Sequence, residues 1–145
     1  MENLTEFKKF IYYLVNISAN IIKPYFRTGM NIEHKEDNSP VTVADKNAEE
    51  AMRRAIVKEY PEHGIIGEEF GSYNEDAEYK WVLDPIDGTK SFVREYGFFS
   101  TQIALMHKNE IIMGLSHAPI FNETAWAAKG LGAFINGENI NVILF

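Results

Sequence analysis

The chain has 145 residues, of which 46% are hydrophobic and 24% are charged, and this length and composition fit one globular domain that buries roughly two-thirds of its unfolded surface. Its formal net charge of -7 opposes a phosphate backbone, so we expect no nucleic-acid partner. Because the sequence has no cysteine, disulfides, zinc thiolate sites and thiol nucleophiles are excluded.

The first predicted element is a helix over residues 4–23. The residues that form its inner face recur at steps of three and four: Leu4, Phe7, Ile11, Leu14, Ser18 and Ile21. We expect this face to pack on the core and the helix to end at Lys23-Pro24. The longest apolar stretch, residues 10–22, is interrupted by polar residues and is too short to span a bilayer. We therefore expect no membrane partner and a cytoplasmic protein.

A polar segment follows over residues 29–40, and it predicts a loop or hairpin. A second helix is expected next, with Thr42 as its cap, Asp45 in its first turn and its end at Tyr60-Pro61. Its buried face is supplied by small and apolar side chains: Ala44, Ala48, Ala51, Met52, Ala55 and Ile56. By itself, Asp45 is explained by a capping role at the start of this helix.

From residue 64 onward the apolar segments become short and are bounded by turn residues, which predicts strands. The expected strands are residues 65–66, 81–83, 101–106, 111–115, 124–127 and 133–135. The turn sequences at residues 106–111 and 129–132 suit hairpins, so much of the sheet should be antiparallel. Two helices followed by a strand-rich half predict an α+β fold in one piece.

The segment Asp84-Pro85-Ile86-Asp87-Gly88-Thr89 carries the most chemistry in the sequence. Its two carboxylates and the intervening backbone carbonyl of Ile86 form a compact set of oxygens of the kind that hard divalent cations prefer. Gly88 and Thr89 would then present backbone N–H groups at the start of a helix, where an anion is favoured. The alternative is that Asp-Pro and Asp-Gly only make a turn.

A second acidic segment is Gly67-Glu68-Glu69, which follows an apolar strand and lies close to another glycine. Taken alone, it is explained by an exposed acidic turn. The four histidines, His34, His63, His107 and His117, lack the spacing of a metal cluster, and we expect them to have surface or packing roles.

The order and spacing of three motifs resemble the inositol monophosphatase superfamily: Ser39-Pro40-Val41-Thr42 with Asp45, then Gly67-Glu68-Glu69, then Asp84 to Thr89. Residues 127–137 are similar to the hairpin that follows the catalytic motif in that family, and residues 88–105 look most like its bacterial histidinol-phosphatase branch. The resemblance implies two long helices packed on a largely antiparallel sheet, as in the N-terminal half of the layered αβαβα sugar-phosphatase fold.

The resemblance also implies a role for each site residue. Glu68, Asp84 and the carbonyl of Ile86 would bind one Mg²⁺, and Asp84 and Asp87 would share a second. Glu69 would support the first site or a further ion, which gives two or three ions in all. As catalytic residues the family implies Asp45 and Thr89, which would orient and deprotonate a metal-bound water, together with Glu68. Asp87, Gly88 and Thr89 would contact the phosphate of a small phosphorylated metabolite, the implied substrate.

Family members are close to twice this length, so the resemblance implies that residues 1–145 are an N-terminal metal- and phosphate-binding domain that lacks the C-terminal domain of the family. Two hypotheses follow. The chain is a Mg²⁺-dependent phosphoric monoester hydrolase, or it is a catalytically impaired remnant that binds a metal ion or a partner chain. In either case we expect exposed apolar surface that favours a homodimer or other self-association.

Overall fold

The computed structural model describes residues 3–27 and 40–143, and the predicted loop or hairpin at residues 29–40 lies outside them except for Pro40. In chain order the helices are α1 (Leu4–Ile22), the 3-10 helix η1 (Lys23–Tyr25), α2 (Pro40–Glu59) and α3 (Thr89–Val93). The strands are β1 (Gly64–Gly67), β2 (Gly71–Tyr73), β3 (Tyr79–Asp87), β4 (Ser100–His107), β5 (Glu110–Ala118), β6 (Glu123–Ala128), β7 (Gly132–Ile135) and β8 (Glu138–Ile140).

Both long helices form where the apolar spacing predicts them. α1 buries the expected face, including Phe7, Ile11 and Leu14. α2 begins at Pro40, so Thr42 lies inside the helix and the first turn holds no acid. The prediction that Thr42 caps this helix and that Asp45 lies in its first turn is therefore wrong. The helix starts earlier because proline is tolerated in a first turn, where the N–H groups have no upstream carbonyl to pair with.

Within the described residues the strands form one sheet of eight, in the order β2-β1-β3-β4-β5-β6-β7-β8. Only the β1–β3 pair is parallel, and every other neighbouring pair is antiparallel. The predicted β4–β5 hairpin is confirmed, and its turn residues Lys108 and Asn109 both have positive φ, as a two-residue type I′ turn requires. The strands that the sequence did not predict, β2 and β8, have three residues each, and none of these residues is buried, so they carry no alternating pattern.

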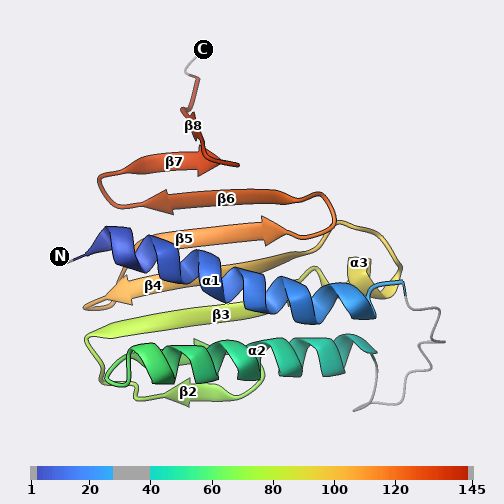
Figure 1. Cartoon of the computed structure of the whole chain (residues 1–145), viewed down its shortest axis with the longest axis horizontal. Coiled ribbons are helices and arrows are strands. Elements are labelled where there is room, and N and C mark those ends of the chain that lie inside the picture. Colours follow the sequence, from blue (N-terminus) through green and yellow to red (C-terminus); the bar gives the residue numbers. More distant parts are fainter. Residues whose placement is uncertain (1–2, 28–39, 144–145) are drawn as a thin grey trace.

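The helices α1 and α2 lie across one face of this sheet, as Figure 1 shows. Because side chains alternate along a strand, every second residue of β3 to β6 points into the layer between helices and sheet. That layer holds the main core, and Trp81, Leu83, Leu105 and Met113 are at most 1% exposed there. The fold is therefore the predicted α+β arrangement of two long helices on a largely antiparallel sheet.

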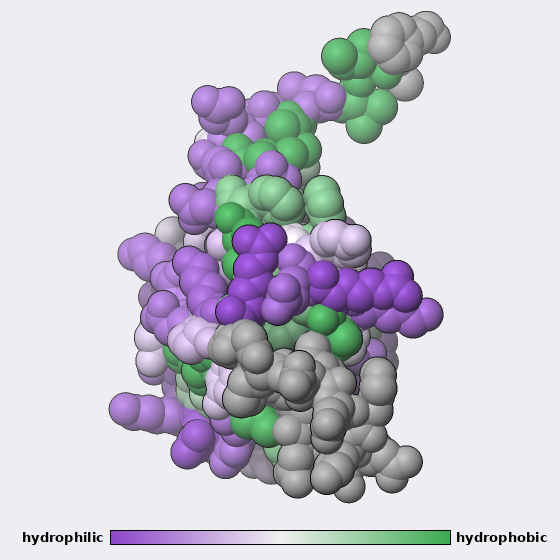
Figure 2. All heavy atoms as spheres, turned by 90° about the vertical axis from the view of Figure 1, so that its right-hand side faces the viewer, coloured by the Kyte–Doolittle hydropathy of each residue, from purple (hydrophilic) through white to green (hydrophobic). Residues whose placement is uncertain are grey.

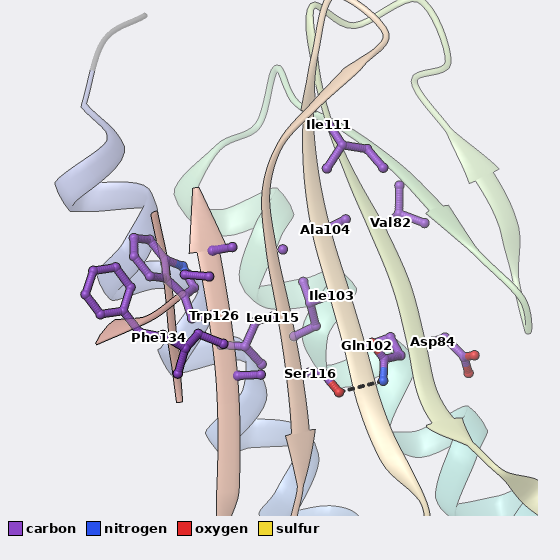
Figure 3. A pocket seen from close by; sticks show the side chains of 15 residues that line it. Val82, Asp84, Gln102, Ile103, Ala104, Ile111, Leu115, Ser116, Trp126 and Phe134 are labelled. Atoms are coloured by element: carbon purple, nitrogen blue, oxygen red, sulfur yellow. Dashed lines mark hydrogen bonds between the residues drawn. The ribbon is translucent and has the colours of Figure 1, made fainter. Parts of the chain in front are cut away.

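The opposite face of the sheet is not covered by any described residue. One row across six strands, from β3 to β8, contains only uncharged small or apolar side chains: Val82, Ala104, Gly114, Ala127, Ala133 and Ile140. We call this row the open-face row. Several of its residues line a shallow hollow, shown in Figure 3, at whose edge Gln102 Nε2 donates a hydrogen bond to Ser116 Oγ over 2.8 Å.

Exposed hydrophobic side chains also gather toward the C-terminal strands. Figure 2 shows hydrophobic atoms at that end of the molecule and hydrophilic atoms over much of the described surface below them. Val142 and Ile143, which follow β8, are 86% and 74% exposed. Among the described residues, no helix is long and apolar enough to cross a membrane.

Candidate metal and phosphate site

The two predicted acidic turns lie at the same edge of the sheet. β1 and β3 run in parallel and their last mutual pair is Gly67 with Leu83, so Glu68 and Asp84 each follow the last residue that the two strands pair with one another. Asp84 itself lies inside β3 and pairs with Gln102 of β4. Glu68 and Glu69 belong to the turn after β1, which we call the Glu68–Phe70 turn. The two strand ends that the sequence predicts to converge are thus neighbours in the sheet.

The turn predicted at Asp84 to Asp87 is wrong, because β3 continues through both residues, and the strand instead changes register between them. Thr101 Oγ1 donates a hydrogen bond to the Pro85 carbonyl over 2.8 Å, which fixes the backbone there. Ile86 is 2% exposed and belongs to the apolar cluster that also contains Ala44 and Ala48 of α2. The packing of one buried side chain therefore holds the end of β3 against α2.

Asp45 comes from α2 and completes the group of acids. Its side chain is buried, with 7% exposure. Three buried side-chain polar atoms in the described ranges lack a hydrogen-bond partner, and two of them are Oδ1 of Asp45 and Oδ1 of Asp84. Buried oxygens without partners are uncommon, and a bound ion or water is one of the explanations for them. In Figure 3 the carboxylate of Asp84 points away from the strand on which it lies.

The acids perturb one another. Burial raises the pKa of Asp45 to about 7, and the carboxylates of Glu69, Asp84 and Glu68 push it the same way, while a hydrogen bond with the Ile86 backbone opposes the rise. Burial also raises the pKa of Asp84 to about 6, with further contributions from Glu68, Asp87, Glu69 and Glu49. This mutual repulsion places the acids in one electrostatic environment, in which each disfavours the charged form of its neighbours.

Glu69 behaves in the same way as its neighbours. Burial raises the pKa of Glu69, Glu49 adds to the rise, and Lys46 opposes it. Within residues 3–27 and 40–143, however, no three His, Asp or Glu side chains lie close enough to form a finished metal cluster. The acids are neighbours whose charges interact, and their side chains are not arranged as a closed cage.

The predicted phosphate contacts lie at the start of α3. Gly88 precedes the helix with φ 96°, a conformation that favours glycine, and a Cβ there would come within 2.9 Å of the Phe98 carbonyl oxygen. Thr89 Oγ1 donates a hydrogen bond to the Ile86 carbonyl over 3.4 Å. Thr89 and Asp45 therefore both make a hydrogen bond with the backbone of the same residue, Ile86.

One residue beside the site was not predicted from the sequence. Glu49 is 0% exposed and accepts hydrogen bonds from the backbone of the Glu68–Phe70 turn. A signal for it exists, because Asp45 and Glu49 are four residues apart on the helical face that also carries Ala44, Ala48 and Met52. Two acids on the buried face of a helix are unusual and could have drawn attention to this position.

Fold and site together define a class: an α+β domain with carboxylates at adjacent strand ends, which is a donor set suited to a hard divalent cation. The model of the inositol monophosphatase family matches residues 3–143. The chain belongs to the inositol monophosphatase family.

Relatives of the chain include phosphatases of several names. It is 35% identical over 144 residues to the fructose-1,6-bisphosphatase/inositol-1-monophosphatase of Aquifex aeolicus, a match that covers 98% of this chain and 54% of the relative. It is 38% identical over 130 residues to the histidinol-phosphatase of Chlorobaculum parvum, covering 89% of this chain and 50% of the relative.

A solved structure gives the same result. An inositol monophosphatase from Zymomonas mobilis matches with a TM-score of 0.85 and 39% identity, over 98% of this chain and 55% of that chain. The chain thus spans about half the length of the relatives that it matches.

Proposed function

We propose that residues 1–145 form the metal- and phosphate-binding domain of a Mg²⁺-dependent phosphatase that hydrolyses a phosphate monoester of a small metabolite. Histidinol phosphate and inositol monophosphate are the candidate substrates, since proteins named for both activities are among the relatives. The likeness of residues 88–105 to the histidinol-phosphatase branch favours the first.

The observation that carries the proposal is the pair of buried oxygens, Oδ1 of Asp45 and Oδ1 of Asp84, that have no hydrogen-bond partner. Leaving a charged or polar group buried without a partner costs free energy, and a cation at Asp84 together with a water at Asp45 would remove that cost. The surrounding donors are carboxylates and a carbonyl, which suit Mg²⁺ better than a softer metal.

In this proposal Glu68, Asp84 and the Ile86 carbonyl hold one Mg²⁺, while Asp84 and Asp87 share a second and Glu69 supports the first or a further ion. Bound Mg²⁺ would supply positive charge that polarises the phosphate and lowers the pKa of a water. The assignment of each ligand follows from the family resemblance together with the position of these residues at two adjacent strand ends.

Asp45 and Thr89 are proposed to act on the attacking water, with Glu68 as the third catalytic residue. The hydrogen bonds that both make to the backbone of Ile86 support this pairing, because they hold the two side chains at one residue. Asp45 is proposed to accept a proton from the attacking water, and Thr89 is proposed to help orient that water. The backbone N–H groups of Gly88 and Thr89 and the side chain of Asp87 are the proposed phosphate contacts.

The test is release of phosphate from histidinol phosphate, inositol monophosphate and p-nitrophenyl phosphate, with and without Mg²⁺. We expect Mg²⁺-dependent release from at least one of them, and we expect Asp84→Asn to abolish it. Asp76→Asn is the matched control, because Asp76 is an exposed acid in the loop before β3. If no Mg²⁺-dependent release occurs but Mg²⁺ still binds, the chain is the impaired remnant rather than an enzyme.

We also propose that the chain associates with a second copy of itself through the open-face row. Support comes from its lack of charge across six strands in a chain whose net charge is -7, so that two copies could meet there without like charges in contact. Nothing lies within 4 Å of a Cβ built on Gly114, in the middle of the row. Glycine inside a strand weakens it and often marks close approach of another backbone.

Sedimentation velocity over a range of concentrations tests this association. We expect a monomer–dimer equilibrium that Ala127→Lys shifts to monomer, because the change places a charge in the centre of the row. Asn122→Lys, in the exposed turn before β6, is the matched control and should leave the equilibrium unchanged. A wild-type chain that stays monomeric and binds no hydrophobic dye would rule out this proposal.

A further inference from the structure

We propose that Glu49 is a positioning residue that ties the Glu68–Phe70 turn to helix α2, so that the carboxylates of this turn face Asp84. This inference rests on the proposed cation site. It concerns a residue that neither holds the ion nor contacts the substrate in that proposal, and it says how the turn is kept in place when the acids repel one another.

The contacts of Glu49 account for both of its oxygens. Oε1 accepts a hydrogen bond from the Glu69 backbone N–H, and Oε2 accepts one from the Phe70 backbone N–H, each over 3.0 Å. Oε2 also accepts a hydrogen bond from Arg53 Nε over 3.0 Å. Hydrogen bonds to a charged acceptor are stronger than neutral ones, so this carboxylate is a firm attachment for the turn.

Arg53 extends the attachment to the far side of the turn. Its Nη2 group donates a hydrogen bond to the carbonyl of Gly71, the first residue of β2, and its guanidinium lies 5.8 Å from the centre of the Phe70 ring. The Glu49–Arg53 pair is almost fully withdrawn from solvent, with side-chain exposures of 0% and 14%. Two residues of α2 therefore make hydrogen bonds to the backbone of the turn and of Gly71, which follows it.

Gly67 has the complementary role in this attachment. A Cβ at this position would lie 2.5 Å from the carboxyl carbon of Glu49, which is closer than side chains approach in real proteins. The backbone of Gly67 has an ordinary φ, so its glycine is required by this contact and not by conformation. The last residue of β1 is thus shaped to admit the carboxylate of Glu49.

The choice of a carboxylate is informative because its charge is unfavourable here. Glu49 adds to the repulsion felt by Asp84 and by Glu69. A glutamine would remove that repulsion, but its NH₂ group would face either a backbone N–H or Arg53, all of which are donors. Three donors converge on this side chain, so they are all satisfied only if both of its terminal atoms are hydrogen-bond acceptors.

The first test compares the Mg²⁺ affinity of wild type, Glu49→Gln and Glu50→Gln by calorimetric titration. Glu50 is a matched control, because it is the next residue of α2 and pairs with Arg54 at the same spacing, but both side chains are more than half exposed. Loss of an outer-shell partner of a metal ligand typically weakens metal affinity about 10- to 100-fold. We expect a loss of about 10-fold or more in Glu49→Gln and little change in Glu50→Gln.

The second test keeps the charge of Glu49 and displaces its carboxylate. In Gly67→Ala the added methyl group meets Glu49, whereas in the matched control Gly114→Ala it meets no atom of the chain within 4 Å. Because Gly114 lies in the open-face row, both variants are compared at a concentration at which sedimentation shows them to be monomeric. Both positions are strand glycines without a positive φ, so the effect on the backbone is the same. Weaker Mg²⁺ binding in Gly67→Ala, but not in Gly114→Ala, would show that Mg²⁺ affinity depends on the position of the Glu68–Phe70 turn and not only on the charge of the site.

Amide hydrogen exchange at Glu69 and Phe70 separates this inference from the proposed function. Both amides should be protected in wild type and lose protection in Glu49→Gln, with circular dichroism confirming that each variant is folded. If the amides lose protection and Mg²⁺ affinity does not change, Glu49 is structural only and the inference is overturned. If protection does not change, the attachment itself is wrong. If wild type binds no Mg²⁺ while Glu49→Gln loses protection, the proposed function fails and the attachment of the turn to α2 by Glu49 stands.

Discussion

The two ends of the parallel strands β1 and β3 differ in almost every physical respect. At the end where both strands begin, rings stack in series: Tyr60 on His63 at 4.5 Å, His63 on Tyr79 at 5.0 Å, and Tyr79 on His107 at 4.5 Å. The Trp81 indole N–H donates a hydrogen bond to His63 Nδ1 over 3.1 Å. At this ring end apolar area is buried and the polar atoms of His63 and Trp81 are paired.

At the end where the strands finish, acids from the Glu68–Phe70 turn, from the last residues of β3 and from α2 raise one another's pKa, and two carboxylate oxygens lack partners. The ring end stabilises the fold, while the acid end costs stability in a chain without a bound cation. Such a division is expected where a binding site is kept in a strained, repulsive arrangement by the rest of the structure. The following predictions test this division.

The largest effect is expected from Phe7→Ala at the ring end. Phe7 is 6% exposed and packs against the rings of Tyr60, Tyr79 and Trp81. Truncating a buried phenylalanine typically lowers the free energy of unfolding by about 3–5 kcal/mol. Urea denaturation is the measurement that tests this loss. Tyr13→Ala, an aromatic residue of the same helix that is 55% exposed, should cost far less. Equal losses would mean that the ring end does not carry the stability.

A smaller effect of opposite sign is expected at the acid end. Asp45→Asn should raise the free energy of unfolding near neutral pH in the absence of divalent ions, because it removes a buried carboxylate that the neighbouring acids repel. Asp76→Asn is the control, since Asp76 lies in an exposed loop. Urea denaturation measures both. A destabilised Asp45→Asn variant would contradict the repulsive character of the site.

The smallest predicted effect is a difference in pH dependence between the two ends. Burial lowers the pKa of His63, so its neutral form is favoured in the fold and its contribution to stability is lost as pH falls below the unfolded value of about 6.5. The raised pKa values of Asp45 and Asp84 act in the opposite direction, because the folded chain then binds more protons than the unfolded chain and gains stability as pH falls toward about 4.

Removal of Asp45 should therefore leave the pH dependence that His63 contributes to the free energy of unfolding less compensated. Between about pH 7.5 and about pH 5.5, the free energy of unfolding of Asp45→Asn should fall more steeply than that of wild type. The measurement is a series of urea transitions across this range without divalent ions. A shallower fall in the variant than in wild type would show that the signs assigned to the two ends are wrong.

The extent to which the sequence predicts this structure follows the same division. Periodicity predicts α1, α2 and six strands, because these elements bury alternating or helical faces. β2 and β8 have no buried face and left no pattern. The start of α2 was predicted too late because Thr42 and Asp45 matched a capping pattern, although the helix begins at Pro40.

The sequence predicts which acids form the candidate site, but not the strand pairing and the Glu49 contacts that hold them in place. The acids at residues 68, 69, 84 and 87 follow apolar strands, and the motif order ties them to one family. That β1 and β3 are parallel neighbours could not be read from local pattern, because it depends on pairing across the sheet. Glu49 was missed because its function depends on backbone N–H groups twenty residues away. The role of each site residue in metal or phosphate binding remains a prediction.

Calorimetric titration of Mg²⁺ into wild type and Asp84→Asn tests the central claim most directly. Asp84 is the one acid proposed to contact both ions, and one of its oxygens is buried without a partner. We predict binding to wild type and a loss of at least about 100-fold in the variant, the upper end of what removing an outer-shell partner costs. Equal binding by the two chains, or no binding by wild type, would contradict the account.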